Sequence, residues 1–110
     1  MKYEISTTGN FTIVALSGEV DLQYSPVARE QILKYLNNNQ NVLVDLSKVN
    51  YIDSSGIASL VEGFQLAKTL NTKFGLVGVS DSAMQVLKLA RLDKVFEIHQ
   101  TADDFFTLES

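Results

Sequence analysis

Alternating apolar and polar residues mark the start of the chain, and short continuous apolar runs mark its middle. Near the N-terminus, two alternating stretches flank the turn residues Thr8-Gly9-Asn10, so an antiparallel hairpin is predicted there. Two later apolar runs, 42–46 and 74–79, indicate buried strands. The predicted strands are residues 3–6, 11–17, 42–46, 74–79 and a short stretch within 92–98.

Helical periodicity separates these strands. Apolar residues recur at helical spacing from Ile57 to Ala67, which predicts a helix from about 55 to 70. Ser25-Pro26 favours an earlier helix, with Ser25 as the N-cap and proline at the first helical position. Two further helices are expected: one begins at Ser80 or Ser82, and one opens at the capping-box pattern Thr101-Ala102-Asp103-Asp104 and carries Phe105 and Leu108.

The resulting element order is ββαβαβαβα, which predicts an α/β fold. After the hairpin, strands alternate with four helices, so parallel pairing with right-handed crossovers is expected in a mixed β-sheet, with helices mainly on one side. Loops that follow parallel strands gather at one edge of the sheet, where open α/β sheets usually carry function. The loops Gly18–Tyr24 and Ser47–Ser55 are therefore expected to bring Asp21 near Asp53 and Ser55.

The polar stretch Asp53-Ser54-Ser55-Gly56 stands between the central strand and its helix. Aspartate and serine are N-cap residues because their side-chain oxygens accept hydrogen bonds from the first helical turn. One capping oxygen is enough, and we expect Ser54 to supply it. Gly56 leaves room for another group to approach the backbone. The surplus hydroxyl indicates a function beyond capping.

Length, charge and composition argue against nucleic-acid-binding, secreted and membrane-spanning proteins. At 110 residues the chain is expected to be one domain, and its net charge of −4 argues against nucleic-acid binding. It has no cysteine, and its N-terminus turns charged at once, unlike a signal peptide. Because no apolar run is long enough to span a membrane, a cytoplasmic protein without membrane contact is predicted.

The sequence contains no motif that is typical of an enzyme active site. The chain has a single histidine, His99, and neither serine lies in a G-x-S-x-G elbow. The scattered carboxylates form no ligand set, and the glycines lack the spacing of a phosphate loop. No catalytic residue, metal site or cofactor is therefore expected. A receiver domain with Asp53 as phosphoacceptor fits poorly, because the chain opens with a hairpin and Asp21 has no second aspartate beside it.

Four segments in order carry a family resemblance: Leu16–Leu22, Leu43–Leu46, Tyr51–Ile57 and Leu87–Phe96. Tyr51-Ile52-Asp53-Ser54-Ser55-Gly56-Ile57 resembles the phosphorylation-site segment of bacterial anti-sigma factor antagonists, which are single STAS domains. The resemblance covers nearly the whole chain. It implies one STAS domain over residues 1–110, with the STAS-like fold, and it places the phosphoacceptor at Ser55.

The resemblance also implies a partner-switching function. The unphosphorylated domain would bind an anti-sigma factor that is a serine kinase, which frees a sigma factor. Phosphorylation of Ser55 would end that binding, and a serine phosphatase would restore it. The expected partner-binding residues are Asp21, Asp53, Ser54, Ser55 and Gly56. Only the family pattern favours Ser55 over Ser54 as the acceptor, and a STAS accessory subunit of a membrane transport complex is the alternative function.

Overall fold

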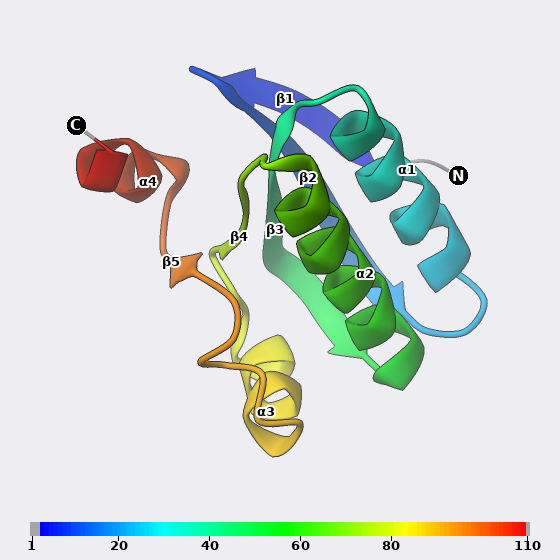
Figure 1. The fold of residues 1–110 in the computed structure, drawn as a ribbon. Helices are drawn as coiled ribbons and strands as arrows, with labels where there is room; N and C mark the ends of the chain where they lie inside the picture. Colours follow the sequence, from blue (N-terminus) through cyan, green and yellow to red (C-terminus); the bar gives the residue numbers. More distant parts are fainter. Residues whose placement is uncertain (1–2, 110) are drawn as a thin grey trace.

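The computed structural model describes the backbone of residues 3–109 and the side chains of residues 3–105. Its elements follow the predicted order ββαβαβαβα, which is confirmed (Figure 1). They are β1 Glu4–Thr8, β2 Phe11–Val20, α1 Ser25–Asn37, β3 Asn41–Ile52, α2 Ser54–Leu70, β4 Phe74–Val77, α3 Asp81–Leu89, β5 Ile98–His99 and α4 Ala102–Glu109.

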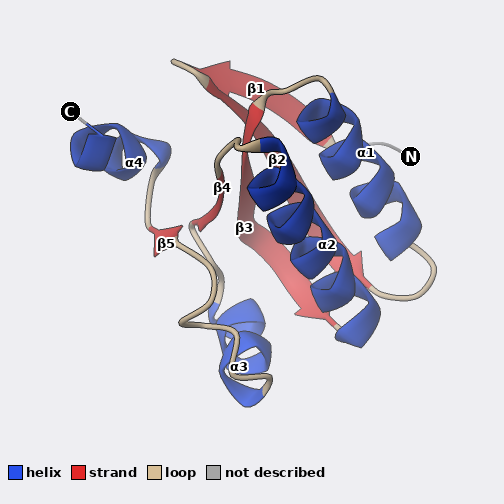
Figure 2. Ribbon diagram, in the orientation of Figure 1, coloured by secondary structure: helices blue, strands red, loops and turns tan. Residues whose placement is uncertain are grey.

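The five strands form one mixed sheet in the order β1-β2-β3-β4-β5. The β1–β2 hairpin is antiparallel, and all later pairs are parallel. The predicted parallel pairing of the strands at 42–46 and 74–79 is confirmed by the register Val42↔Phe74 through Asp45↔Val77. Figure 2 shows α1 and α2 side by side in front of this sheet.

Alternation along β3 divides the core between the two faces of the sheet. Val42, Val44 and Leu46 point into the main core, which α1, α2 and α3 cover. Leu43 belongs to a smaller cluster on the other face, where Phe105 of α4 packs. The expectation of helices mainly on one side therefore holds for three of the four helices. The Leu108 side chain lies outside the described side chains.

The central strand is much longer than predicted. β3 continues from Ser47 to Ile52, a stretch that the sequence analysis interpreted as loop. This part pairs with the end of β2, from Ser17↔Lys48 to Val20↔Ile52, with two irregularities in register. Its outer face is exposed, so polar residues occupy positions that a buried strand would fill with apolar ones.

Other element boundaries also differ from the predictions. β4 ends at Val77, because Gly78 follows with a φ of +58°. The last strand is Ile98–His99 and not a stretch within 92–98 alone. The terminal helix starts as expected, and the Asp104 carboxylate accepts the Thr101 N–H at 3.3 Å.

The helix caps confirm one prediction and correct another. The Ser80 hydroxyl caps α3 by accepting the N–H of Ala83 at 3.3 Å. In α1, Tyr24 is the N-cap and Ser25 is already helical, so the predicted Ser25 cap is wrong. The preceding turn explains this, because the Ser25 N–H already donates to the backbone oxygen of Asp21 at 2.7 Å.

Candidate functional site

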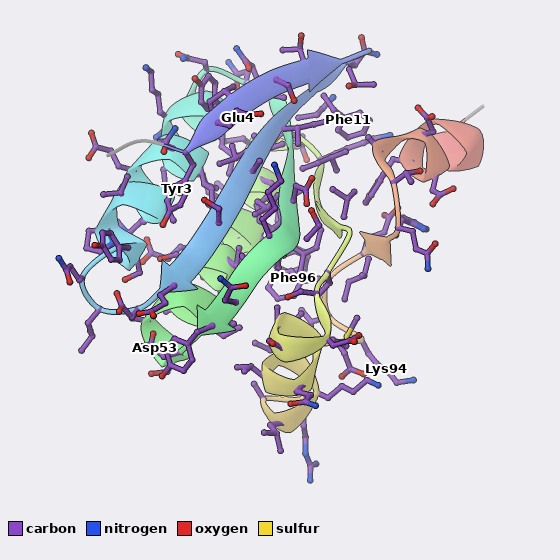
Figure 3. All side chains as sticks on the ribbon, turned by 180° about the vertical axis from the view of Figure 1, so that it is seen from behind. Tyr3, Glu4, Phe11, Asp53, Lys94 and Phe96 are labelled. Carbon is purple, nitrogen blue, oxygen red and sulfur yellow. The ribbon has the colours of Figure 1, made fainter. Side chains whose placement is uncertain are left out.

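The Asp53-Ser54-Ser55-Gly56 stretch lies where β2 and β3 end together and α2 begins. Val20 pairs with Ile52, the last residues of the two strands, and the Asp53 N–H donates to the Val20 oxygen at 3.3 Å. Viewed from behind, Asp53 lies at one end of the sheet and Phe11 near the other (Figure 3). The site therefore sits at the carboxyl end of the longest parallel pair.

Asp53 is the N-cap of α2, in extended backbone conformation. Its Oδ1 accepts three hydrogen bonds: from the Ser55 N–H at 2.9 Å, the Ser55 hydroxyl at 2.5 Å and the Gly56 N–H at 3.3 Å. The hydroxyl of Ser55 is the largest cause that lowers the pKa of Asp53 below its ordinary value, and the backbone N–H groups, including that of Leu22, add to it. Asp53 is therefore a carboxylate at neutral pH.

The two serines have different environments, and the predicted N-cap role of Ser54 is wrong. Ser54 is the first helical residue, is exposed, and makes no side-chain hydrogen bond to residues 3–105, whose side chains the structure describes. Ser55 is half-buried and donates its hydroxyl hydrogen to Asp53. The cap falls one residue earlier than expected because the carboxylate of Asp53 reaches both free N–H groups of the first turn.

Gly56 has a packing role that explains its missing side chain. A Cβ at this position would lie 2.6 Å from Ile52 Cγ1 and 2.7 Å from the backbone oxygen of Val20. The group that approaches the backbone here is thus the end of the sheet. Partner contact by Gly56, which is buried, stays a prediction.

Asp21 lies in the neighbouring loop, as the topology predicted. Its Oδ1 accepts the N–H groups of Gln23 at 3.0 Å and Tyr24 at 3.2 Å, which shapes the turn from β2 into α1. The backbone N–H of Leu22 contributes to the low pKa of Asp53, so this loop and the start of α2 are in contact. Asp21 organises its own loop, and its role toward a partner stays a prediction.

Two exposed apolar side chains flank the polar site and were missed by the sequence analysis. Leu22 is 79% exposed and Tyr51 is 51% exposed. Each lies close to a site residue in the sequence: Leu22 directly follows Asp21, and Tyr51 precedes Asp53 by two residues. Both are apolar residues within stretches that were predicted as loops, Gly18–Tyr24 and Ser47–Ser55, and this was the sequence signal that could have identified them.

Ser55 also lines a groove of about 660 Å³ between α1 and α2. On the rim of this groove, Arg29 of α1 donates to Glu62 of α2 at 2.8 Å. The single hydrogen of the buried Ser59 hydroxyl is shared between the backbone oxygens of Ser55, at 3.2 Å, and Ser25, at 3.4 Å. Ser59, which the sequence analysis also missed, ties the start of α2 to the start of α1.

The site offers two hydroxyls and one carboxylate. Because the pKa of Asp53 is lowered, this carboxylate is a weaker base than that of an ordinary aspartate. His99 lies on β5, 3.1 Å from Glu97 and packed on Phe105, away from Ser55. Among the described residues, no three potential ligands gather to hold a metal ion. Along the same part of the chain, no helix is both long and apolar enough to cross a membrane.

Comparisons with known proteins agree with this geometry. The STAS domain model matches residues 2–105. The anti-sigma-B factor antagonist of Listeria monocytogenes is 28% identical over 86 residues, 77% of this chain and 75% of that protein. An anti-sigma factor antagonist from Mycobacterium paratuberculosis superposes with a TM-score of 0.85 at 27% identity, covering 97% of this chain and 92% of that one.

The Bacillus cell fate determinant SpoIIAA, solved in its phosphorylated form, shares the fold with a TM-score of 0.74. Its identity to this chain is 14%, and the match covers 98% of this chain and 99% of that one. The described fold has the five-stranded mixed sheet and the four helices that the sequence pattern predicted. Because the family model spans nearly all of the chain, the protein belongs to the STAS domain family.

Proposed function

We propose that this protein is an anti-sigma factor antagonist, a regulatory binding protein that is switched by phosphorylation of Ser55. The observation that carries the proposal is the Ser55 hydroxyl, held 2.5 Å from Asp53 in the first turn of α2 at the end of the sheet. The names of the Listeria and Mycobacterium relatives support the same function.

In this proposal the unmodified protein binds an anti-sigma factor serine kinase, so that a sigma factor is released for transcription. The kinase phosphorylates Ser55, binding ends, and a serine phosphatase returns the protein to its binding form. The protein catalyses no reaction itself and acts in the cytoplasm without direct contact to nucleic acid or membrane. Asp21, Asp53, Ser54, Ser55 and Gly56 form or support the contact surface.

Phosphorylation would change the electrostatics of this surface at one point. The modified Ser55 oxygen loses the hydrogen that it donates to Asp53, and it gains a charge of roughly −1.5 to −2 beside a carboxylate. The N–H groups of Ser55 and Gly56 already bond to Asp53, so the phosphate must compete for them. Like-charge repulsion therefore acts next to the partner surface, and a partner would have to bury a strongly hydrated group.

Ser55 is favoured over Ser54 by its fixed geometry. Asp53 accepts the hydroxyl hydrogen of Ser55, which orients the oxygen lone pairs away from the carboxylate and toward an incoming phosphoryl group. Ser54 is exposed without such an acceptor, so its hydroxyl rotates between several orientations. A kinase that requires an aligned nucleophile would act on Ser55.

The test is capture of partners on the immobilised, unmodified protein, followed by mass spectrometry. We expect an anti-sigma factor serine kinase, and incubation of the captured complex with ATP and magnesium should phosphorylate Ser55. Immobilised Ser55→Ala should capture the same kinase without being phosphorylated. Immobilised Ser54→Ala should capture the kinase and be phosphorylated like the protein with the original sequence. Capture of a transport ATPase or membrane transporter would support the transport-subunit alternative, and phosphate on Ser54 would refute the assignment to Ser55.

A further inference from the structure

A second polar and aromatic site lies at the end of α2 opposite to Ser55. A pocket of about 560 Å³ opens between the last turns of α2, the strands β4 and β5, and α4. Its volume lies within the range of small-molecule sites, roughly 300–1,000 Å³. None of the residues of the phosphorylation site lines it.

The apolar wall of this pocket consists of phenylalanine rings that are held by their neighbours. Phe64 packs edge-on against Phe96 with ring centroids 5.6 Å apart, and Phe74 lies 6.1 Å from the same ring. Phe105 packs edge-on against His99 at 4.6 Å. Because these contacts fix the rings, the wall is preformed for another flat apolar group, which aromatic edges and faces attract.

Positive charge gathers on the polar side of the pocket, although the whole chain carries −4. Among the lining residues whose side chains the structure describes, Lys68 and Lys73 are cationic and Glu97 is acidic, with its carboxylate 3.1 Å from His99 Nε2. The Lys68 ammonium lies 5.8 Å from the centre of the Phe64 ring, so charge and aromatic surface are adjacent. This combination matches a ligand that is both anionic and aromatic.

Thr72 supplies an unsatisfied hydrogen-bonding group in the same wall. Its hydroxyl is screened from solvent and has no hydrogen-bond partner among the described residues. Its backbone N–H is already used, since it donates to the Ala67 oxygen at 2.9 Å and helps to end α2. A buried hydroxyl without a partner is unfavourable, and rotation of the Thr72 side chain toward a ligand oxygen would relieve this.

We propose that this pocket binds a small organic anion with an aromatic body, of the aryl phosphate or aryl carboxylate class. The ring packs against Phe64, Phe74 and Phe105, and the anionic group lies between the Lys68 ammonium and the Thr72 hydroxyl. The α2 residues that line the pocket, Phe64 and Lys68, lie about 14 and 20 Å along the helix axis from Ser55. The ligand therefore leaves the surface around Ser55 uncovered, and the proposal does not depend on the function of that surface.

The first experiment is a titration of the isotope-labelled protein with phenyl phosphate, followed by amide chemical shifts. We expect saturable shifts at residues 72–75 and 97–99, with a dissociation constant on the order of 1 mM or tighter for a ligand of this size. Inorganic phosphate has the anionic group without the ring, and benzyl alcohol has the ring without the charge. Each should bind at least about tenfold more weakly than phenyl phosphate. Equal shifts with inorganic phosphate, or no saturable shift in this region, would overturn the proposal.

Matched variants make the test specific. Lys68→Gln should weaken phenyl phosphate binding several-fold and Lys68→Arg should retain it, because arginine keeps the charge. Lys34→Gln is the control, since Lys34 also lies over an aromatic ring, at 5.7 Å from Tyr35, but outside the pocket. Thr72→Val should raise the melting temperature and yet weaken binding, because it removes an unpaired hydroxyl that the ligand uses. Equal losses in Lys34→Gln and Lys68→Gln would refute the site.

Discussion

The hydroxyl of Ser55 donates its hydrogen to Oδ1 of Asp53 at 2.5 Å, and the same oxygen caps the helix that carries Ser55. The hydrogen bond of the proposed phosphoacceptor and the N-cap of α2 thus share one atom. Any change at Ser55 alters the cap, and any change at Asp53 alters the orientation of the Ser55 hydroxyl. This link makes several outcomes predictable.

Substitution of Ser55 should separate binding from folding. Ser55→Ala removes the acceptor oxygen and one hydrogen bond, and we expect partner binding to be retained. Ser55→Asp places a second carboxylate beside Asp53 and should weaken binding at least about tenfold by charge repulsion and desolvation. Calorimetric titration with the captured kinase measures both. Binding of Ser55→Asp as tight as that of the unmodified protein would contradict the switch.

Asp53 should make stability depend on pH in the acidic range. The pKa of Asp53 is lower in the folded state than in the unfolded state. The ionised carboxylate therefore stabilises the fold at pH values above the unfolded pKa. That stabilisation is lost as the pH falls through the folded pKa. Asp53→Asn keeps a side-chain acceptor but cannot titrate, so the protein with the original Asp53 should be more stable than this variant at neutral pH. The difference in unfolding free energy between the two should shrink below about pH 4.

Urea unfolding of both proteins at neutral pH and near pH 3 measures this difference. Asp53→Ala is the companion variant, because it removes the cap entirely and should lower the melting temperature by roughly 5 °C at neutral pH. A difference between Asp53→Asn and the unmodified protein that does not vary with pH would show that the carboxylate charge has no role in the cap.

Ser54→Ala should leave stability nearly unchanged, in contrast to the loss that an N-cap serine would show. Ser54 is exposed and is not the cap, and alanine is a good helix former. We expect a change in unfolding free energy within about 0.5 kcal/mol. Thermal unfolding measures it, and a loss of about 1 kcal/mol or more would restore Ser54 as a capping residue.

Gly56→Ala should destabilise the protein, although the same change usually stabilises a helix interior. The added Cβ would meet Ile52 Cγ1 at 2.6 Å and the Val20 oxygen at 2.7 Å. Relief of this overlap requires α2 to shift from the sheet end, at a cost of about 1–3 kcal/mol. Ala58→Gly on the exposed side of α2 is the control for helix propensity and should cost about 1 kcal/mol. A stabilised Gly56→Ala protein would contradict the observed packing.

Leu22→Ser should weaken partner binding without loss of stability. Leu22 is 79% exposed, so its side chain contributes little to the core, but its loop contacts Asp53. If Leu22 is buried at the centre of the interface, its truncation should cost about 1 kcal/mol or more of binding free energy. Leu89→Ser is the matched control, since Leu89 is 87% exposed at the end of α3. Unchanged affinity of Leu22→Ser would place the interface elsewhere.

Much of the fold follows from local patterns in the sequence. Turn residues at Thr8-Gly9-Asn10 and the apolar runs near Val44 and Leu76 predicted the hairpin and the two parallel strands correctly. The extension of β3 through Tyr51 could not be predicted, because its pairing with β2 depends on residues about 30 positions away and its exposed face is polar. Period-two patterns are weak where a strand has one open face and irregular register.

The candidate site was predicted in composition but not in detail. The sequence showed that Asp53 and two serines meet at a helix start, yet several oxygens could have been the cap. Backbone conformation decided it, because the extended Asp53 directs its carboxylate over the first turn. The bond from Ser59 to Ser25 depends on the packing of two helices, which no local pattern encodes.

β3 is much longer than β4, and this difference affects the local stability of the sheet beside Asp53. β4 ends at Val77, opposite Asp45, so the last part of β3, which leads into Asp53, pairs with β2 alone. Backbone amides in this two-stranded end should exchange with solvent sooner than those of Val42 to Val44, which have a strand on each side. In the proposed switch, a kinase and a phosphatase would each have to fit Ser55 into a different catalytic cleft. We expect a site at this two-stranded end to adapt to both, while the part of β3 that pairs with two strands stays closed.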